Sequence, residues 1–259
     1  MEVNGASASL EQVRALALTN YGHFTSMLVQ DFRVRGLSLH MERLARDCRQ
    51  LFGAELDTDA VRHYVRHALP GNPGPVTVRV TVYDPALDLG TIGSDAEPGV
   101  LVTTRPAAHG VPAPLRLRAV SYQREVPSVK HVSVFGALRH RRCAQRAGFD
   151  DVLFTTHDGM VCELSTSNIG FVQGGRIVWP RSEWLPGITM ALINRVLDEP
   201  TAMEPIKLSD LPAMEAAFAT NSVTGVRAVM SVDRTRWPTD HKTLARLRTL
   251  YAETPGELL

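Results

Sequence analysis

The chain has 259 residues, a formal net charge of +1 at pH 7, 44% hydrophobic residues and 21% charged residues. These values are typical of a globular protein with one large domain or two smaller ones, and the near-neutral charge argues against a nucleic-acid-binding surface. No apolar run approaches the roughly 20 residues that span a bilayer, and the first residues lack the pattern of a signal peptide. The three cysteines lack metal-ligand spacing, which predicts a reducing, cytoplasmic compartment with no disulfide framework and no metal site.

The first part of the chain predicts strands and helices in alternation. Two strands are expected within residues 22–35, around a turn at Gln30-Asp31. Apolar residues recur every three or four positions over residues 37–53, which predicts a helix that stops at Gly53. The further elements expected here are a helix at 57–69 and strands at 75–84 and 100–106. Together they predict a small N-terminal α/β domain over residues 1–105.

Residues 106–115 hold three prolines and a glycine, and they are interpreted as an interdomain linker. The remaining residues, 116–259, predict a larger domain with a mostly antiparallel sheet and flanking helices, so the fold class is α+β. The elements expected in this part are a strand at 115–125, a helix at 131–147, three strands within 150–180, a helix at 188–199, two strands within 216–233 and a helix at 242–253. Asp158-Gly159 and Gly174-Gly175 are expected at hairpin turns.

Lysine is rare in this chain, which has 28 basic residues of which only Lys130, Lys207 and Lys242 are lysines. Lys130 stands before a helix-patterned segment and away from any charge run. An ε-amine can lose its proton and attack a carbonyl to form a Schiff base, whereas a guanidinium stays protonated. Taken alone, Lys130 fits an ordinary surface lysine as well as a reactive amine.

Four other features carry possible chemistry, and each also has an ordinary structural interpretation. Glu163 ends an apolar strand, where an unpaired carboxylate would be costly. The segment 185–189, LPGIT, opens a helix whose free amides could bind phosphate, and the small, hydroxyl-rich loop 219–225 could be a second anion site. Arg43 could offer a guanidinium fork to a phosphate oxygen.

The order and spacing of these features resemble the fold-type IV pyridoxal-phosphate enzymes, the class IV aminotransferase family of branched-chain aminotransferases, D-amino-acid aminotransferases and aminodeoxychorismate lyases. The motifs that carry the resemblance are HMERL at 40–44, VKH at 129–131, the run RAGFDDVLFTTHDGMVCELSTSNIGFV at 146–172, and LPGIT at 185–189. The resemblance runs through nearly the whole chain. It implies two domains, the larger with a barrel-like core, and a homodimer acting on amino and keto acids.

The resemblance also implies a role for particular residues toward pyridoxal 5'-phosphate. Lys130 would form the Schiff base and move the Cα proton, and Glu163 would pair with the pyridine nitrogen. Arg43, Ile188, Thr189 and Ser222 would hold the phosphate, in a cofactor site between the domains. Asn168 is expected to organise the turn after Glu163. The residues expected to contact substrate are Tyr21, His23, Thr25, Arg79, Val223 and Thr224.

The chain departs from the family where substrate is expected to bind, so three functions stay open. The N-terminal motif reads NYGHFTSM, with Thr25 where glutamate is common, and this position and His131 resemble the lyase branch. Ser133 and Phe135 depart from the lyases and from the branched-chain enzymes, respectively. An aminotransferase is the first interpretation, a pyruvate-releasing lyase the second, and a non-catalytic binding protein on the same scaffold the third.

Overall fold

A computed structural model describes residues 1–71, 74–108 and 110–259, so His109 of the predicted linker lies outside the described residues. The chain divides into two compact units by its contacts. Unit 1 comprises Met1–His109, Val129–Ser133 and Gly256–Leu259, and unit 2 comprises Gly110–Ser128 and Val134–Pro255. The short segment that carries Lys130 therefore groups with unit 1, although the residues on both sides of it in the sequence belong to unit 2.

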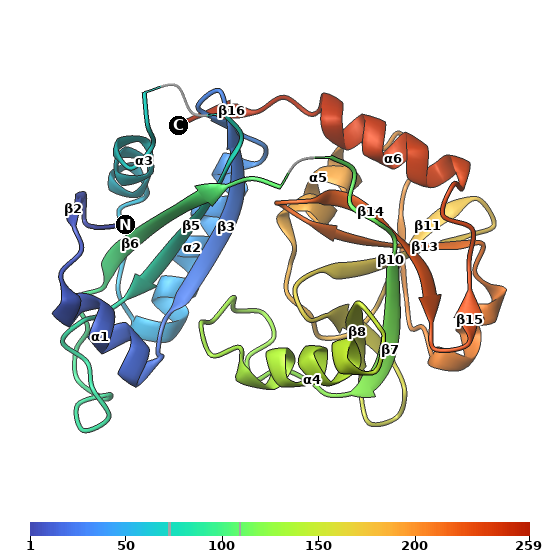
Figure 1. Cartoon of the computed structure of the whole chain (residues 1–259), viewed down its shortest axis with the longest axis horizontal. Coiled ribbons are helices and arrows are strands. Elements are labelled where there is room, and N and C mark those ends of the chain that lie inside the picture. Colours follow the sequence, from blue (N-terminus) through green and yellow to red (C-terminus); the bar gives the residue numbers. More distant parts are fainter. Residues whose placement is uncertain (72–73, 109) are drawn as a thin grey trace. The chain divides into compact units, whose positions relative to one another are not determined.

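Unit 1 is built on a seven-stranded sheet with the order β16-β4-β3-β5-β6-β1-β2, and every pairing in it is antiparallel (Figure 1). The strands are β1 (Glu2–Val3), β2 (Ala6–Ser7), β3 (His23–Gln30), β4 (Arg33–Val34), β5 (Val76–Tyr83), β6 (Gly99–Pro106) and β16 (Glu257–Leu258). The helices are α1 (Leu10–Thr19), α2 (Leu37–Phe52) and α3 (Thr58–His67).

The core of unit 1 lies between one face of this sheet and the helices α2 and α3. Alternate residues of β3 and β5 point to this face, which is lined mainly with valine, while Leu37, Met41 and Leu44 of α2 pack against it. Helix α2 stops at Gly53, whose φ of 64° is a left-handed conformation that glycine adopts without strain. The predicted helix 37–53 is thus confirmed, including its end.

Unit 2 is built on a nine-stranded sheet in which β9 pairs with both β8 and β10, so that β10-β13-β14-β7-β8-β9 form a closed barrel. The strands are β7 (Leu115–Ser121), β8 (Asp151–Thr155), β9 (Val161–Leu164), β10 (Asn168–Gln173), β11 (Arg176–Pro180), β12 (Ala202–Glu204), β13 (Ala216–Asn221), β14 (Gly225–Val232) and β15 (Thr235–Arg236). Pairings of β7 with β8 and β14, and of β11 with β12, are parallel, and the others are antiparallel. The predicted α+β class with a barrel-like second half is confirmed.

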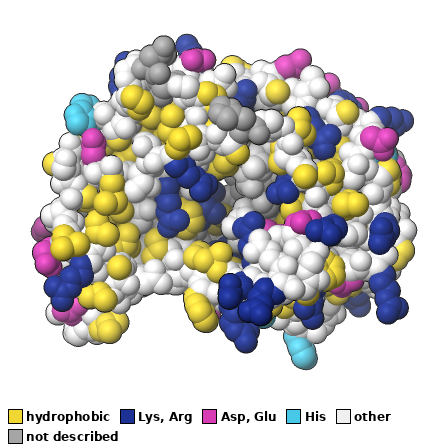
Figure 2. Space-filling view, viewed as in Figure 1, with side chains coloured by type: hydrophobic (Ala, Val, Ile, Leu, Met, Phe, Trp, Pro, Cys, Tyr) yellow, Lys and Arg dark blue, Asp and Glu magenta, His cyan; other side chains and the backbone are white. Residues whose placement is uncertain are grey.

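Helices cover the outside of the barrel (Figure 1). They are α4 (Phe135–Arg146), α5 (Ile188–Val196) and α6 (Lys242–Glu253), whereas the 3-10 helix η1 (Leu208–Ala213) contributes Leu211 to the cluster that fills the barrel. Inward-facing residues such as Leu117, Leu153 and Phe171 fill the barrel, and a second cluster packs α5 and α6 against its outer face. Lys and Arg side chains gather over α4, whose sequence FGALRHRRCAQR has no acidic residue (Figure 2).

Four expectations about local structure need correction. The turn after β3 is at Asp31 and Phe32, which both have positive φ, one residue later than expected. The predicted helix 131–147 begins only at Phe135, because residues 130–132 pair with the start of β3. Residues 150–180 form four strands instead of three, since a turn at 165–167 separates β9 from β10. Helix α1 was not expected.

Among the residues that the structure describes, no helix is long and apolar enough to cross a membrane.

Candidate active site

The backbone of Lys130 is fixed to the edge of the unit 1 sheet. The amide of Phe24 donates to the Lys130 carbonyl at 2.8 Å, and the amide of Val132 donates to the Gly22 carbonyl at 2.9 Å. These bonds form a short antiparallel bridge along the first half of β3. That edge of the strand is free for the bridge because β4 pairs only with the second half of β3. The backbone of Lys130 is therefore held by a strand edge, whereas the sequence predicted only that Lys130 precedes a helix.

A buried carboxylate supports the same segment from α2. Asp47 is 1% exposed, and its Oδ2 accepts a hydrogen bond from the Lys130 amide at 3.2 Å. The other oxygen, Oδ1, accepts from the guanidinium of Arg46 at 2.6 Å. Because both oxygens have partners, the cost of burying this charge is offset. Asp47 was not predicted as a site residue, since nothing in its local sequence marks it.

Arg43 of α2 belongs to a buried polar group with Thr25 and His40. Arg43 is 6% exposed, and its Nη2 donates to the Thr25 hydroxyl at 2.6 Å. The same hydroxyl lies 2.6 Å from His40 Nδ1. Burial is the main reason that the pKa of Arg43 falls to about 10, and it also holds the pKa of His40 well below its usual value. Thr25 thus orients Arg43, which was predicted to bind phosphate.

Three of the predicted substrate contacts face α2. Tyr21 donates through its hydroxyl to the Leu51 carbonyl at 2.9 Å, and its ring meets Phe52 edge-on. The ring of His23 lies 6.1 Å from the same phenylalanine, and neither of its nitrogens has a hydrogen-bond partner among the described residues. Because β3 alternates, His23 and Thr25 share the core-facing side of the strand. All three side chains are committed to packing within unit 1.

Arg79, the fourth predicted contact, lies on the opposite face of the sheet. Its guanidinium carbon is 3.6 Å from the centre of the Phe24 ring, and the Lys130 Nζ is 4.9 Å from that same centre. The Phe24 ring therefore makes cation–π contacts with both Arg79 and Lys130 on this face of the sheet. Phe24 was not singled out from the sequence, although its position between His23 and Thr25 on an alternating strand is the signal that could have found it.

In unit 2, Glu163 is a buried carboxylate with two partners. It is 7% exposed, its Oε1 accepts from Arg124 Nε at 2.9 Å, and its Oε2 accepts from the Leu185 amide at 3.2 Å. Arg124 also donates to the Pro127 carbonyl at 2.5 Å. Glu163 is thus not the unpaired carboxylate that the apolar strand suggested. The structure adds Arg124 to the site residues.

Strand register places Glu163 in a row of polar residues on the outer face of the barrel. Asn168 of β10 is opposite both Glu163 of β9 and Thr220 of β13, and opposite residues share a face. Asn168 Nδ2 donates to the Leu185 carbonyl at 2.8 Å. Asn168 thus pairs with Glu163 across the turn at 165–167, and its side chain also holds the loop that enters α5.

The beginning of α5 has the features of an anion-binding helix N-terminus. Its N-cap residue is Gly187, which offers no side chain to the first amides, so these are available to a ligand. A Cβ at Gly187 would lie 1.9 Å from Asn168 Oδ1, so only glycine fits there. Thr189 and Thr220 are each 1% exposed, and within the described part of the chain their hydroxyls lack hydrogen-bond partners. Buried hydroxyls without partners are costly, and a hydrogen-bonding ligand at the start of α5 would offset that cost for the Thr189 hydroxyl.

The loop that holds the predicted residues Ser222, Val223 and Thr224 is a tight hairpin between β13 and β14. Asn221 Oδ1 accepts hydrogen bonds from the amides of Val223 at 3.0 Å and Thr224 at 2.9 Å, and from the Thr224 hydroxyl at 3.1 Å. These donors are engaged with Asn221 in this structure. All three predicted residues are half-buried.

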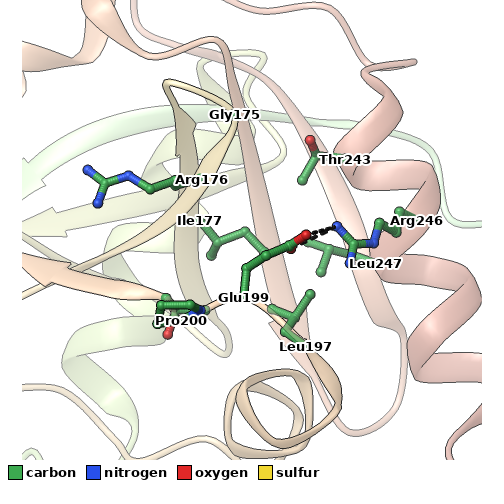
Figure 3. A pocket seen from close by; sticks show the side chains of 10 residues that line it. Gly175, Arg176, Ile177, Leu197, Glu199, Pro200, Thr243, Arg246 and Leu247 are labelled. Carbon is green, nitrogen blue, oxygen red and sulfur yellow. Dashed lines mark hydrogen bonds and ion pairs between the residues drawn. The ribbon is translucent and has the colours of Figure 1, made fainter.

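The described residues of unit 2 line several hollows, and two of these are well defined. One, of about 250 Å³, is lined by Pro127, Ser128, Ser182, Glu183 and Trp184, next to residues that contact Arg124 and Glu163. The other, of about 110 Å³, lies beside the β10–β11 hairpin, where Glu199 pairs with Arg246 at 2.8 Å (Figure 3). This hairpin is at the end of β10 remote from Asn168, so the second pocket is separate from the Glu163 row.

These features define a class of protein by its scaffold and its site: a two-unit α+β chain with a lysine held at a strand edge, a buried carboxylate and a helix N-terminus that no side chain caps. The sequence model described as amino-transferase class IV matches residues 22–232. The chain therefore belongs to the class IV aminotransferase family, and it is a pyridoxal-phosphate-dependent enzyme.

Individual relatives agree with this assignment. The chain is 23% identical over 250 residues to a probable branched-chain-amino-acid aminotransferase of Rickettsia bellii, in a match that covers 89% of this chain and 86% of the relative. Among solved structures, a branched-chain aminotransferase from the archaeon Thermoproteus uzoniensis, solved with norvaline, has a TM-score of 0.82 at 19% identity, covering 97% and 92% of the two chains. A candidate 4-amino-4-deoxychorismate lyase from Legionella pneumophila has a TM-score of 0.80 at 21% identity, covering 96% of each chain. At these identities the two structures show the fold alone.

Proposed function

We propose that this enzyme transfers an amino group between an amino acid and a keto acid, with Lys130 as its reacting amine. The observation that carries the proposal is the fixed position of Lys130, whose backbone is bonded to Phe24 and Asp47. When bound, pyridoxal phosphate supplies an aldehyde that takes up the amino group and a ring that draws electrons from the substrate Cα. Lys130 would hold this group covalently, and its amine would remove the Cα proton and return it.

Residues of unit 2, together with Arg43 of unit 1, would hold the ring and the phosphate. Glu163 is buried and pairs with Arg124 at 2.9 Å, and its carboxylate would hold a proton on the pyridine nitrogen. The amides of Ile188 and Thr189 at the uncapped start of α5, with the Thr189 hydroxyl, would bind phosphate oxygens. Thr220, with its buried hydroxyl, is a further candidate phosphate ligand, and Ser222 and Arg43 are proposed for the same role.

Chemical labelling tests the proposal, because the chain has only three lysines. The protein loaded with pyridoxal phosphate should be yellow, and borohydride reduction should fix the label on Lys130, as peptide mass spectrometry would show. Lys130→Ala should be colourless after dialysis, whereas the matched variants Lys207→Ala and Lys242→Ala should keep both colour and label. A label on Lys207 or Lys242, or none at all, would overturn the proposal.

Product analysis separates the aminotransferase from the two other candidate functions. An aminotransferase should convert the bound cofactor to its amine form when an amino acid is added alone, whereas a lyase should release pyruvate from aminodeoxychorismate without an acceptor. Thr25, the position that resembles the lyase branch, accepts a hydrogen bond from Arg43 of α2. A wild-type protein that stays colourless with added cofactor would support a non-catalytic binding protein.

We propose further that the enzyme is a cytoplasmic homodimer. The support is the family assignment, together with the predicted reducing compartment and the three free cysteines, of which Cys48 and Cys162 are buried. Light scattering coupled to size-exclusion chromatography should give twice the chain mass of 28.4 kDa.

A further inference from the structure

We propose that Asp47 of α2 is a positioning residue for the proposed reaction, because its buried carboxylate fixes the point on the backbone from which the Lys130 amine extends. Asp47 and Lys130 both belong to unit 1. The inference rests on the proposed function, since it takes Lys130 as the reacting amine. Asp47 would act only through the lysine and would touch neither substrate nor cofactor.

Both polar groups of the Lys130 backbone are hydrogen-bonded. Its amide donates to Asp47 Oδ2 at 3.2 Å, and its carbonyl accepts from the Phe24 amide at 2.8 Å. The nearby Val129 and Val132 are buried, with exposed fractions of 0% and 7%. A backbone held in this way has little freedom, so the amine moves mainly by rotation about the bonds of its own side chain. Holding a reacting group in a fixed place in this manner speeds its reaction with a bound partner.

The edge of β3 is by itself a short anchor for this segment. The bridge around the pair His23 and His131 consists of the two main-chain hydrogen bonds described above. Residues 122–129, all of which the structure describes, contain no helix or strand, and α4 begins only at Phe135. Asp47 therefore adds an anchor from a different element, a 16-residue helix that is packed on the sheet.

The ion pair with Arg46 does not account for the burial of Asp47. The Asp47 side chain is 1% exposed, whereas that of Arg46 is 41% exposed and donates to Oδ1 alone, at 2.6 and 3.0 Å. An arginine this exposed is well hydrated, and an ion pair at the surface would avoid the cost of burying the carboxylate. The hydrogen bond that requires Asp47 to be inside the unit is the one to Lys130.

A carboxylate suits this position because the charged groups around it are cations. Burial, and then the charges of Arg43 and Lys130, lower the pKa of His40. Burial lowers the pKa of Arg43 to about 10, and the charge of Asp47 opposes this fall. Among the buried residues of α2, all of which the structure describes, Asp47 is the only acid. It therefore offsets the repulsion between these cations while it holds the lysine.

Exchange of the Lys130 amide with solvent tests the contact directly. Because the chain has only three lysines, protein made with isotope-labelled lysine gives three backbone amide signals in NMR, which Lys207→Arg and Lys242→Arg assign. The Lys130 amide should exchange about tenfold or more slowly in the wild type than in Asp47→Ala, since a hydrogen bond to a charged group is lost. Asp47→Asn, which keeps an oxygen acceptor, should restore most of this protection. The Lys207 amide, which donates to Asp210 in unit 2, should exchange equally in all variants.

The rate at which Lys130 is labelled tests the consequence for the reaction. With excess pyridoxal phosphate and cyanoborohydride, Asp47→Ala should acquire the label about tenfold or more slowly than the wild type, because its amine lacks a fixed anchor. Asp47→Asn should be labelled at close to the wild-type rate. Asp84→Asn is the matched control, since Asp84 is 7% exposed, lies in unit 1 and accepts from the amides of Ala86 and Glu97, both at 2.7 Å. It should change the rate little.

Several results would overturn the inference. One is rapid exchange of the Lys130 amide in the wild type, which is measurable even if Asp47→Ala does not fold. Another is a folded Asp47→Ala that is labelled at the wild-type rate, or equally slow labelling of Asp47→Ala and Asp84→Asn, because any buried acid would then have the same effect. Equally slow labelling of Asp47→Asn and Asp47→Ala would show that the hydrogen bond is not what matters.

The inference and the proposed function fail in different experiments. A label on Lys207 or Lys242 would overturn the proposed function, whereas exchange of the Lys130 amide would still report on the contact with Asp47. A label confined to Lys130 that forms equally fast in the wild type and in Asp47→Ala would overturn the inference and leave the proposed function intact.

Discussion

At the scale of single residues, the hydroxyl of Thr25 joins two groups that the sequence placed in different roles. Thr25 was predicted to contact substrate and Arg43 to bind phosphate. In the structure Thr25 is fully buried and its oxygen lies 2.6 Å from both Arg43 Nη2 and His40 Nδ1. A guanidinium this deeply buried depends on its acceptors, so Thr25 acts as a positioning residue for Arg43.

We expect Thr25→Val to lower the free energy of unfolding by about 2 kcal/mol. The change preserves the shape of the side chain but removes an acceptor from a buried cation, and hydrogen bonds to charged groups contribute about 1.5–3 kcal/mol. Urea unfolding followed by circular dichroism measures this. Thr104→Val, at an exposed position of β6, is the control and should change stability little. A Thr25→Val protein as stable as the control would show that the bond is unimportant.

At the scale of elements, the segment between Arg124 and Lys130 contains a strained residue. Val126 has a φ of +45°, a left-handed conformation that β-branched residues rarely adopt, and it precedes a proline. Its side chain is 45% exposed, so packing of Val126 itself is not what holds it there. Hydrogen bonds on either side of Val126 hold it in this conformation. Arg124 donates to Glu163 and to the Pro127 carbonyl, and the Lys130 carbonyl accepts from the Phe24 amide of β3.

Val126→Gly should therefore raise the free energy of unfolding by about 1 kcal/mol. A left-handed backbone conformation destabilises the folded state by about 1–3 kcal/mol when the residue is not glycine. Glycine removes this strain, but its greater conformational freedom in the unfolded chain offsets part of the stabilisation. Thermal and urea unfolding would both report it. The matched variant is Val111→Gly, which changes an exposed valine without positive φ and should lose stability slightly. If both variants lose stability, the strain at Val126 is negligible.

At the scale of the whole molecule, unit 1 contains two buried, uncharged histidines that make it sensitive to acid. Burial, assisted by the positive charges of Arg43 and Arg46, lowers the pKa of His23 from 6.5 to about 3. The pKa of His40 is also well below its usual value, again mainly because of burial. Between about pH 6.5 and pH 3, His23 is protonated in the unfolded chain but not in the folded chain. The free energy of unfolding therefore falls as the pH falls through this range.

We expect His23 to contribute a slope of about 1.4 kcal/mol per pH unit between about pH 6 and pH 3, the value for one proton. His23→Leu should flatten the fall in stability over this range, since it removes one of the groups that binds protons only when unfolded. Urea midpoints measured at several pH values give the slope. His157→Leu, at an exposed position, should leave it as in the wild type. An unchanged slope in His23→Leu would mean that His23 is protonated in the folded protein.

Much of the fold was predictable because its signals are local. The heptad-like spacing of α2, the alternation of β5 and the glycines at 174 and 175 correspond directly to the observed helix, strand and turn. Helix α1 lacked such a signal, since none of its residues is buried. The break between β9 and β10 was missed because residues 161–173 are apolar on both sides of it.

The sequence by itself determined the chemistry: a scarce lysine, a carboxylate after an apolar strand and a glycine-opened helix are chemical facts about side chains, and their order along the chain identified the family. Only the tertiary structure showed which residues contact these chemical groups. Asp47 behind Lys130, Arg124 beside Glu163 and Phe24 against Arg79 are pairs separated by 83, 39 and 55 positions in the chain. Strand register and burial, which set these contacts, depend on the packing of distant segments, and no local pattern records them.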